Sequence, residues 1–291
     1  MTGRQVKAMA EQNPFTISPD ELQSLLGDEN LRIVDGSWYL PAQGRDGRAE
    51  YEMTRIPGAV YFDLDAISDT SSPLPHMLAR PEAFAAAVGA MGIAETNDIV
   101  VYDGLGVFSS ARVWWNFRVM GAKSVRLLDG GFKNWKETGR PVETGAPKTP
   151  QPAVFTPQFD ASRVCTIADI KANLKLGEKP ILDARPYGRF TGEVPEPRPG
   201  LRPGHIPGAQ SMPADTFSVD GKLKDISELK ELFQAVLLDP NRHAITSCGS
   251  GVTAAIISLA LDSIGHPDHS LYDGSWAEWG QADDAPVATW E

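Results

Sequence analysis

The chain has 291 residues, of which 42% are hydrophobic and 22% charged, and its formal net charge is −11. This composition is that of a globular protein and excludes a disordered or fibrous chain. The acidic balance argues against general nucleic-acid binding, and an anionic substrate would need a local cluster of cations. At about 150 residues per domain, the length predicts two domains.

Targeting signals and cysteine usage narrow the class further. Residues 1–15 lack the apolar run of a secretory signal, and the chain has no stretch of about 18 apolar residues that could span a membrane. Cys165 and Cys248 are the only cysteines, and neither belongs to a Cys-x-x-Cys pair. We therefore expect no disulfide scaffold and no structural zinc site, and we expect a protein of the reducing cytoplasm.

The sequence contains an internal repeat. Four short blocks recur in the same order at offsets of 144 to 150 residues. The first copies of the blocks start at Ile33, Arg55, Val101 and Leu128, and the second copies start at Ile181, His205, Thr246 and Tyr272. Such self-similarity predicts two copies of one domain.

Each copy alternates apolar strand-like runs with helical ones. In chain order, we expect a strand at 99–102, a helix at 109–120 and a strand at 125–128, and then a strand at 244–247, a helix at 253–263 and a strand at 271–272. The pattern predicts an α/β protein with two homologous domains, each a mainly parallel sheet flanked by helices. We place them at 14–140 and 161–291, with residues 141–160 as a proline-rich linker.

The two copies differ at one informative position, where the first has Asp103 and the second has Cys248. Cys248 follows a predicted strand and precedes Gly249, Gly251 and a predicted helix. Two glycines let the backbone curl so that its N–H groups form an anion-binding nest at the helix N-terminus. That environment favours the thiolate, which is the nucleophilic form of cysteine. A small buried apolar role for this cysteine stays open at this point.

Several other reactions fit this loop less well. A cysteine phosphatase needs an arginine six positions after the cysteine, where this chain has Ala254, and a serine-hydrolase elbow around Ser250 needs glycines where it has Cys248 and Val252. The spacing of the five histidines marks none as a protease base, although proximity in the fold stays open. A dinucleotide fingerprint lacks its acidic partner. A thiolate with no cation inside its loop suits carrying a sulfur atom as a persulfide.

The loop from Cys248 to Thr253, the His-Ile-Pro-Gly-Ala block at 205–209 and the Asp-Gly-Ser-Trp block at 273–276 resemble the 3-mercaptopyruvate sulfurtransferases of the two-domain rhodanese family. The resemblance covers nearly the whole chain. Thiosulfate-preferring relatives are similar to Cys-Arg-Lys-Gly-Val-Thr here, whereas this chain has Gly249 and Ser250 in place of the two cations. Fewer cations fit a donor that carries a carboxylate and a thiol.

The resemblance implies that sulfur passes from 3-mercaptopyruvate to a Cys248 persulfide and then to cyanide, a small thiol or thioredoxin, with release of pyruvate. It implies no metal and no organic cofactor. Two alternatives remain: a thiosulfate:cyanide sulfurtransferase, and a non-catalytic rhodanese-like module that binds a partner or senses persulfides.

Residue roles in the second domain also follow from the resemblance. Ser250 is implied to act with Cys248 in catalysis, and the rest of its loop, which comprises Gly249, Gly251, Val252 and Thr253, is implied to bind substrate. Arg189 and Arg198 lie in the loop after the strand at 181–183, and the resemblance implies that they hold the carboxylate and carbonyl of the donor. We expect Arg185 and Arg202 to be structural.

In the first domain, Asp65 and His76 would otherwise be turn residues, but the resemblance implies that both face the active cleft. Asp65 is implied to support Ser250 and Cys248 through hydrogen bonds, and His76 to contact the substrate. We choose Asp65 over Asp63 by its spacing to His76. We expect the tryptophans at 38, 114, 115, 135, 276 and 279 to pack in the core or between the domains.

Overall fold

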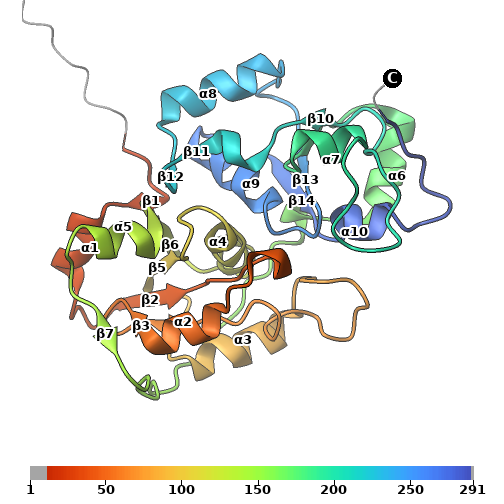
Figure 1. Ribbon diagram of the computed structural model, residues 1–291. Coiled ribbons are helices and arrows are strands. Elements are labelled where there is room, and N and C mark those ends of the chain that lie inside the picture. The colour runs from red at the N-terminus through yellow and green to blue at the C-terminus, as the bar shows by residue number, and fades with distance from the viewer. Residues whose placement is uncertain (1–11, 290–291) are drawn as a thin grey trace, which may run out of the picture.

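The computed structural model describes residues 12–289 and consists of two units with the same strand topology (Figure 1). The first sheet has the order β1-β6-β5-β2-β4 and the second β10-β9-β13-β14-β8, and every strand pair in both is parallel. Read from its other edge, the second order matches the first strand for strand. The predicted fold class is therefore confirmed. Residues 1–11 and 290–291, which hold most of the segment searched for a signal and the end of the predicted second domain, lie outside the described residues.

The first unit is formed by the described residues up to 144. Its strands are β1 (Thr16–Ile17), β2 (Leu31–Asp35), β3 (Thr54–Arg55), β4 (Val60–Tyr61), β5 (Asp98–Tyr102), β6 (Ser124–Leu128) and β7 (Glu143–Thr144). Its α-helices are α1 (Pro19–Leu25), α2 (Gly47–Met53), α3 (Pro81–Ala90), α4 (Ser109–Val119) and α5 (Gly131–Glu137). A short 3-10 helix covers Pro41–Gln43.

The second unit repeats this plan. Its strands are β8 (Val164–Cys165), β9 (Ile181–Asp183), β10 (Gln210–Ser211), β11 (Ser218–Val219), β12 (Lys222–Leu223), β13 (Ala244–Ser247) and β14 (His269–Tyr272). Its α-helices are α6 (Ile167–Leu176), α7 (Tyr187–Thr191), α8 (Ile226–Ala235), α9 (Ala254–Ser263) and α10 (Ser275–Trp279), with 3-10 turns at Ala161–Arg163 and Ala214–Phe217. The six elements predicted from hydrophobic patterns are present within two residues of their expected bounds.

Helices α4 and α9 lie side by side where the two units meet (Figure 1). All ten residues of α9 are buried, because α4 covers the side that its own sheet does not. One apolar cluster runs through both helices, from Phe62 and Trp114 in the first unit to Ile257 and Leu229 in the second. The largest core is therefore shared between the two units. Each unit keeps a smaller cluster of its own on its other side.

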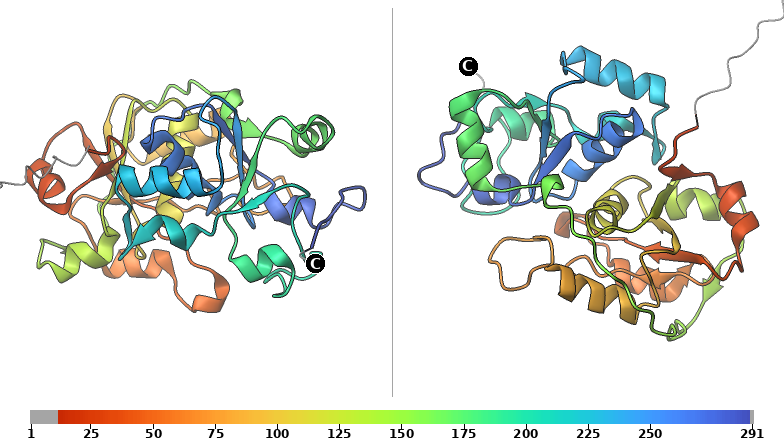
Figure 2. Two further views of the ribbon diagram at one scale, coloured as in Figure 1. Left: turned by 90° about the horizontal axis from the view of Figure 1, so that it is seen from above. Right: turned by 180° about the vertical axis from the view of Figure 1, so that it is seen from behind.

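The proline-rich segment at 141–160 runs along the outside of the first unit on its way to the second (Figure 2). Strand β7 within it pairs antiparallel with β3, and the N–H of Ala153 donates to the carbonyl of Gly89 at 2.8 Å. Phe155 is buried against the rings of Phe84 and Phe117. The segment is extended, as its prolines predict, but it is held against the protein by backbone bonds and one aromatic side chain.

In the part of the chain that the structure describes, none of the helices combines the length and the apolar character needed to cross a membrane.

Phe155 and its neighbour Val154 provide a test of how firmly this segment is held. Phe155→Ala should lower the free energy of unfolding by about 3–5 kcal/mol, because it leaves a cavity among aromatic rings. Val154, which is 81% exposed, is the matched control, and Val154→Ala should change stability by less than about 0.5 kcal/mol. Urea unfolding measures both variants, and equal losses would contradict the packing described here.

Candidate active site

Cys248 lies at the carboxyl end of β13, directly before the turn into α9. Its N–H donates to the hydroxyl of Ser275 at 3.2 Å, and its carbonyl accepts the N–H of Trp276 at 2.9 Å. The start of α10 therefore supports the loop from beneath. The side chain of Cys248 is only 1% exposed, but it contributes to the wall of a cavity. The carboxyl ends of parallel strands are where such sheets bind ligands. A buried thiol that faces a cavity there is placed for chemistry as well as for packing.

The loop that follows presents unused backbone donors. Within residues 12–289, nothing accepts a hydrogen bond from the N–H groups of residues 249–253. Gly251 has a φ of +76°, the left-handed conformation that turns consecutive amides inward. The loop therefore forms an open nest of donors beside the sulfur, which is suited to a negative charge on that atom.

The corresponding loop of the first unit shows what such a nest holds. The carboxylate of Asp103 accepts hydrogen bonds from the N–H groups of Leu105, Gly106, Phe108 and Ser110, at 2.6 to 3.0 Å. An internal anion thus fills the first copy of the nest. In the second copy, Cys248 takes the position of Asp103 and leaves the amides free for a charge that arrives during a reaction.

A chain of side chains leads from this loop into the first unit. Ser250 Oγ lies 3.1 Å from His76 Nδ1, and His76 Nε2 lies 3.1 Å from Asp65 Oδ1. Trp38 donates from its indole N–H to the other oxygen of Asp65 at 3.0 Å. The hydrogen bond from His76 holds the pKa of Asp65 below its ordinary value. Together Asp65, His76 and Ser250 form a relay that can steady charge or move a proton beside the sulfur.

The relay adds two details to the sequence prediction. No bond joins Asp65 directly to Ser250 or Cys248 among the described residues, because His76 lies between them. His76 is buried behind Ser250 and does not contribute to the cavity wall. Asp63, the alternative to Asp65, instead caps the turn by accepting the N–H of Ala66.

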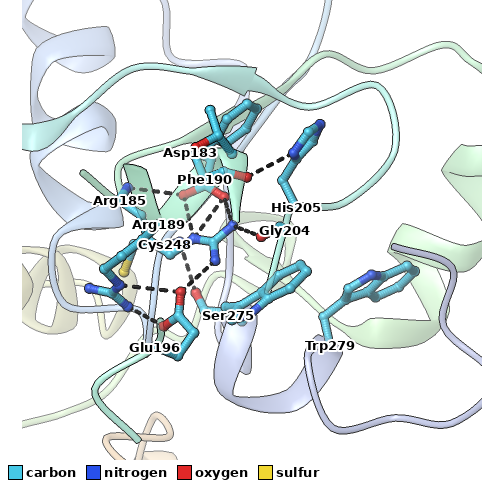
Figure 3. Close-up of polar contacts among 12 residues, drawn as sticks. Asp183, Arg185, Arg189, Phe190, Glu196, Gly204, His205, Cys248, Ser275 and Trp279 are labelled. Carbon is cyan, nitrogen blue, oxygen red and sulfur yellow. Dashed lines mark hydrogen bonds and ion pairs between the residues drawn. The ribbon is translucent and has the colours of Figure 1, made fainter. Parts of the chain in front are cut away.

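Two arginines, Arg189 and Arg198, reach the cavity from the segment after β9, and Figure 3 shows the first of them beside Glu196 and Cys248. Arg189, on α7, donates from Nε and Nη2 to the two oxygens of Glu196. Its guanidinium lies over Gly249, where a Cβ would come within 2.9 Å of Nη2. Arg198 is half-buried, and no hydrogen-bond or ion-pair partner is found for its guanidinium within residues 12–289. Burial lowers the pKa of Arg198, and the nearby Cys248 sulfur opposes that effect.

Arg185 and Arg202 are structural, as predicted. Arg185 is 1% exposed and ion-paired with both Asp183 and Glu196 (Figure 3). Its guanidinium also lies over the ring of Trp276. Arg202 donates to three backbone carbonyls, those of residues 279, 280 and 282. The bonds of Arg202 tie the loop after β9 to residues 279–282. Neither guanidinium is left free for a ligand.

Both units build the cavity above Cys248, which has a volume of about 320 Å³. The second unit contributes its cations and the reactive loop, including Gly249, Val252 and Thr253, whereas Gly251 faces Arg112 instead. The first unit contributes mainly apolar side chains, namely Trp38, Leu40, Leu105, Val107 and Phe108. Trp38 packs against the shared core, as expected, and its indole also lines the cavity and donates to Asp65.

Comparison with known proteins agrees with this architecture. The model of the rhodanese-like domain matches twice, at residues 18–138 and 166–282. This chain belongs to the rhodanese-like family. It is 42% identical to the human protein named 3-mercaptopyruvate sulfurtransferase over 263 residues, covering 89% of this chain and 88% of that protein. It is 44% identical to a Chinese hamster (Cricetulus griseus) protein named thiosulfate sulfurtransferase over 253 residues, covering 86% of this chain and 84% of that one.

A solved structure shows the same fold. The crystal structure of SseA from Escherichia coli, described as a 3-mercaptopyruvate sulfotransferase with the rhodanese fold, superimposes with a TM-score of 0.83 at 38% identity. The match covers 90% of this chain and 98% of SseA. The family resemblance expected from the loop and the repeated blocks is thus confirmed.

Two residues of this rhodanese-like protein escaped the sequence reasoning. Glu196, with a side chain 1% exposed, holds Arg185 and Arg189 at once. Arg112, which is fully buried, joins the two units. The available signals were two acids, Glu193 and Glu196, within a cationic, proline-rich loop and an arginine among small and apolar residues at the start of a helix. Among the described residues, no group of three or more His, Cys, Asp or Glu side chains could hold a metal ion.

The two cysteines should react very differently with iodoacetamide. Burial raises the pKa of Cys165 to about 12, so only about one Cys165 thiol in 10,000 is ionised at pH 8. Brief treatment of the native protein should therefore alkylate Cys248 alone, as read by peptide mass mapping. Native Cys248→Ser protein should stay unlabelled, and both thiols of the wild type should react in urea. Equal labelling of Cys165 in the native state would contradict the assigned environments.

Proposed function

We propose that this rhodanese-like protein is a sulfurtransferase that takes sulfur from 3-mercaptopyruvate onto Cys248 and passes it to a thiol or to cyanide. The observation that carries the proposal is the position of one thiol below two guanidinium groups and beside a ring of unused amides. Sulfur transfer needs a nucleophilic sulfur, a site for the donor's anion and donors for the charge that moves. The cavity above Cys248 combines all three.

The proposed first step begins with attack of the Cys248 thiolate on the sulfur of 3-mercaptopyruvate. A sulfur–sulfur bond forms, the carbon–sulfur bond of the donor breaks, and its electron pair passes into the enolate of pyruvate. The enolate then takes up one proton at carbon and leaves as pyruvate, and Cys248 is left as a persulfide. Arg189 and Arg198 hold the donor's carboxylate and the carbonyl oxygen that gains charge.

The loop and the relay serve the sulfur end of this reaction. The N–H groups of residues 249–253 can stabilise the thiolate before the step and the persulfide anion after it. Ser250, bonded to His76, can donate to the sulfur or exchange a proton with it, and the ionised Asp65 fixes the orientation of His76. In the second step an acceptor thiolate or cyanide attacks the outer sulfur and restores the Cys248 thiolate.

Charge in the cavity favours a donor with a single negative charge. Glu196 offsets one of the two cations, Arg189, and Arg198 has no ion-pair partner among the described residues. The exposed Asp215 in the cavity wall adds one negative charge. The loop adds none, since Gly249 and Ser250 are neutral. 3-Mercaptopyruvate brings one carboxylate, whereas thiosulfate is a dianion. We therefore propose 3-mercaptopyruvate as the preferred donor, and thiosulfate:cyanide transfer is the alternative, since a relative of 44% identity is named for thiosulfate.

We place the reaction in a reducing compartment, the cytoplasm, where free thiols persist and acceptors such as small thiols or thioredoxin are available. The two cysteines of the chain are both free thiols, in keeping with that setting.

Intact mass spectrometry tests the proposal directly. After brief incubation with 3-mercaptopyruvate and removal of excess donor, wild-type protein should gain one sulfur atom and release one equivalent of pyruvate. Cys248→Ser should do neither, and Cys165→Ser should behave like wild type. Failure of the wild type to gain sulfur or to release pyruvate, even with an excess of acceptor thiol, would instead support a binding or sensing module.

Substitution of Glu196 tests the charge argument for the donor. Glu196→Gln removes the charge that offsets Arg189, and the ratio of kcat/KM for thiosulfate to that for 3-mercaptopyruvate should rise about tenfold, since one unit charge several Å away is worth over 1 kcal/mol. Glu193→Gln is the matched control, because it removes the same charge from an exposed position of the same loop and should leave the ratio unchanged. An unchanged ratio in Glu196→Gln would refute the charge argument.

A further inference from the structure

The relay beside Cys248 is assembled across the boundary between the two units. Asp65 and His76 belong to the first unit, and Ser250 and Cys248 belong to the second. The 3.1 Å hydrogen bond between His76 and Ser250 would weaken sharply if the units shifted by a few tenths of an ångström. Something close to the relay must therefore hold the two loops in register.

Arg112 lies at this junction. It projects from α4 and is fully buried. Its Nη2 donates to the Asp273 carboxylate at 2.6 Å and to the carbonyl of His76 at 2.7 Å, and its Nη1 donates to the carbonyl of Gly251 at 3.3 Å. One guanidinium thus touches the backbone of His76 itself and that of the residue following Ser250.

Asp273 completes the connection from the second unit. It follows β14, and its second oxygen accepts the N–H of Leu78 at 2.7 Å. The carboxylate therefore grips the same loop of the first unit two residues beyond His76. Ser275, close by in sequence, accepts the N–H of Cys248. The turn at 273–275 consequently supports the Cys248 loop and the His76 loop together.

The backbone is left-handed on either side of the hydrogen bond between His76 and Ser250. His76 has a φ of +59° although it is not a glycine, and Gly251 has a φ of +76°. Such conformations persist where the surroundings hold them. Arg112 bonds to the carbonyls of both residues, and a Cβ at position 251 would lie 2.7 Å from its Nη1. The two left-handed residues and the guanidinium are therefore fitted to one another.

We propose that Arg112 and Asp273 are positioning residues that set the geometry between His76 and Ser250, and through it the rate of sulfur transfer to Cys248. Neither residue contributes to the cavity wall, so the pair acts through the relay and not on the donor. This inference rests on the proposed sulfurtransfer function. It differs from a general role in stability, because it predicts that the effect of Arg112 depends on the presence of Ser250.

The test is a double-mutant cycle on the single-turnover rate of pyruvate release from 3-mercaptopyruvate. Arg112→Lys keeps the charge but loses the forked donors, and it should lower the maximum rate about ten- to a hundredfold with the half-saturating donor concentration within about twofold. In a Ser250→Ala background, the same change should lower the rate by less than about twofold further. If Arg112→Lys lowers the single-turnover rate by the same factor in the wild-type and Ser250→Ala backgrounds, the proposal is overturned.

Arg163→Lys is the matched control. Arg163, whose side chain is 14% exposed, is also ion-paired with a buried carboxylate, that of Asp262, but its partners lie within the second unit and away from the relay. Arg163→Lys should lower the melting temperature by the same amount in the wild-type and Ser250→Ala backgrounds. Should Arg112→Lys fail to fold, Asp273→Asn carries the same cycle, since it keeps a side-chain oxygen for one of the two bonds.

A separate measurement distinguishes failure of the proposed function from failure of the positioning role. If wild-type protein releases no pyruvate, that function is wrong, and the positioning role is then judged from the rate of Cys248 alkylation by iodoacetamide at one fixed pH. Arg112→Lys should change that rate severalfold, because the loop beside the sulfur loses its support, whereas Arg163→Lys should not. Identical rates in wild type and Arg112→Lys would overturn the positioning role.

Discussion

The packing of α4 against α9 is the constraint on which the rest of the structure depends. These two helices lie between the sheets and bury apolar side chains of both units in one shared core. The cavity above Cys248 and the relay through His76 are made from both units, so they exist only while this interface is intact. Apolar burial supplies most of the attraction, and the buried Arg112–Asp273 pair adds a fixed geometry that apolar contact alone would not impose.

Duplication of the domain explains how one loop geometry came to have a structural role in the first unit and a reactive role in the second. In both units a strand ends in a turn whose amides converge on one point. In the first unit, the carboxylate of Asp103 occupies that point and accepts hydrogen bonds from four of those amides. These bonds make the loop a permanent part of the cavity wall. In the second unit, Cys248 stands at the same point and the amides stay unbonded among the described residues. The copy with the closed loop then supplies Leu105, Val107 and Phe108 to the cavity of the open one.

The cations of the cavity illustrate how little net charge a site needs in an acidic protein. Arg189 and Arg198 line the cavity, Arg185 shares Glu196 with Arg189, and Asp183 and Glu196 offset two of these three cations. Those ion pairs hold the guanidinium planes in fixed orientations in a buried setting, where a rearrangement would leave a charge unpaired. The result is a rigid site in which Arg198 alone has no ion-pair partner among these three arginines within residues 12–289, in a chain whose net charge is −11.

Local sequence determined the repeat, the α/β class, the principal strands and helices, and the singular position of Cys248, because these depend on apolar periodicity and on glycine placement within a few residues. Tertiary structure alone decided that His76 stands between Asp65 and Ser250, that Trp38 faces the cavity, and that Glu196 restrains Arg189. Arg112 reaches Gly251 across 139 positions of sequence, and nothing in either neighbourhood encodes the other. Such contacts arise from the docking of two finished units, and their geometry is set by the shapes of both surfaces at once.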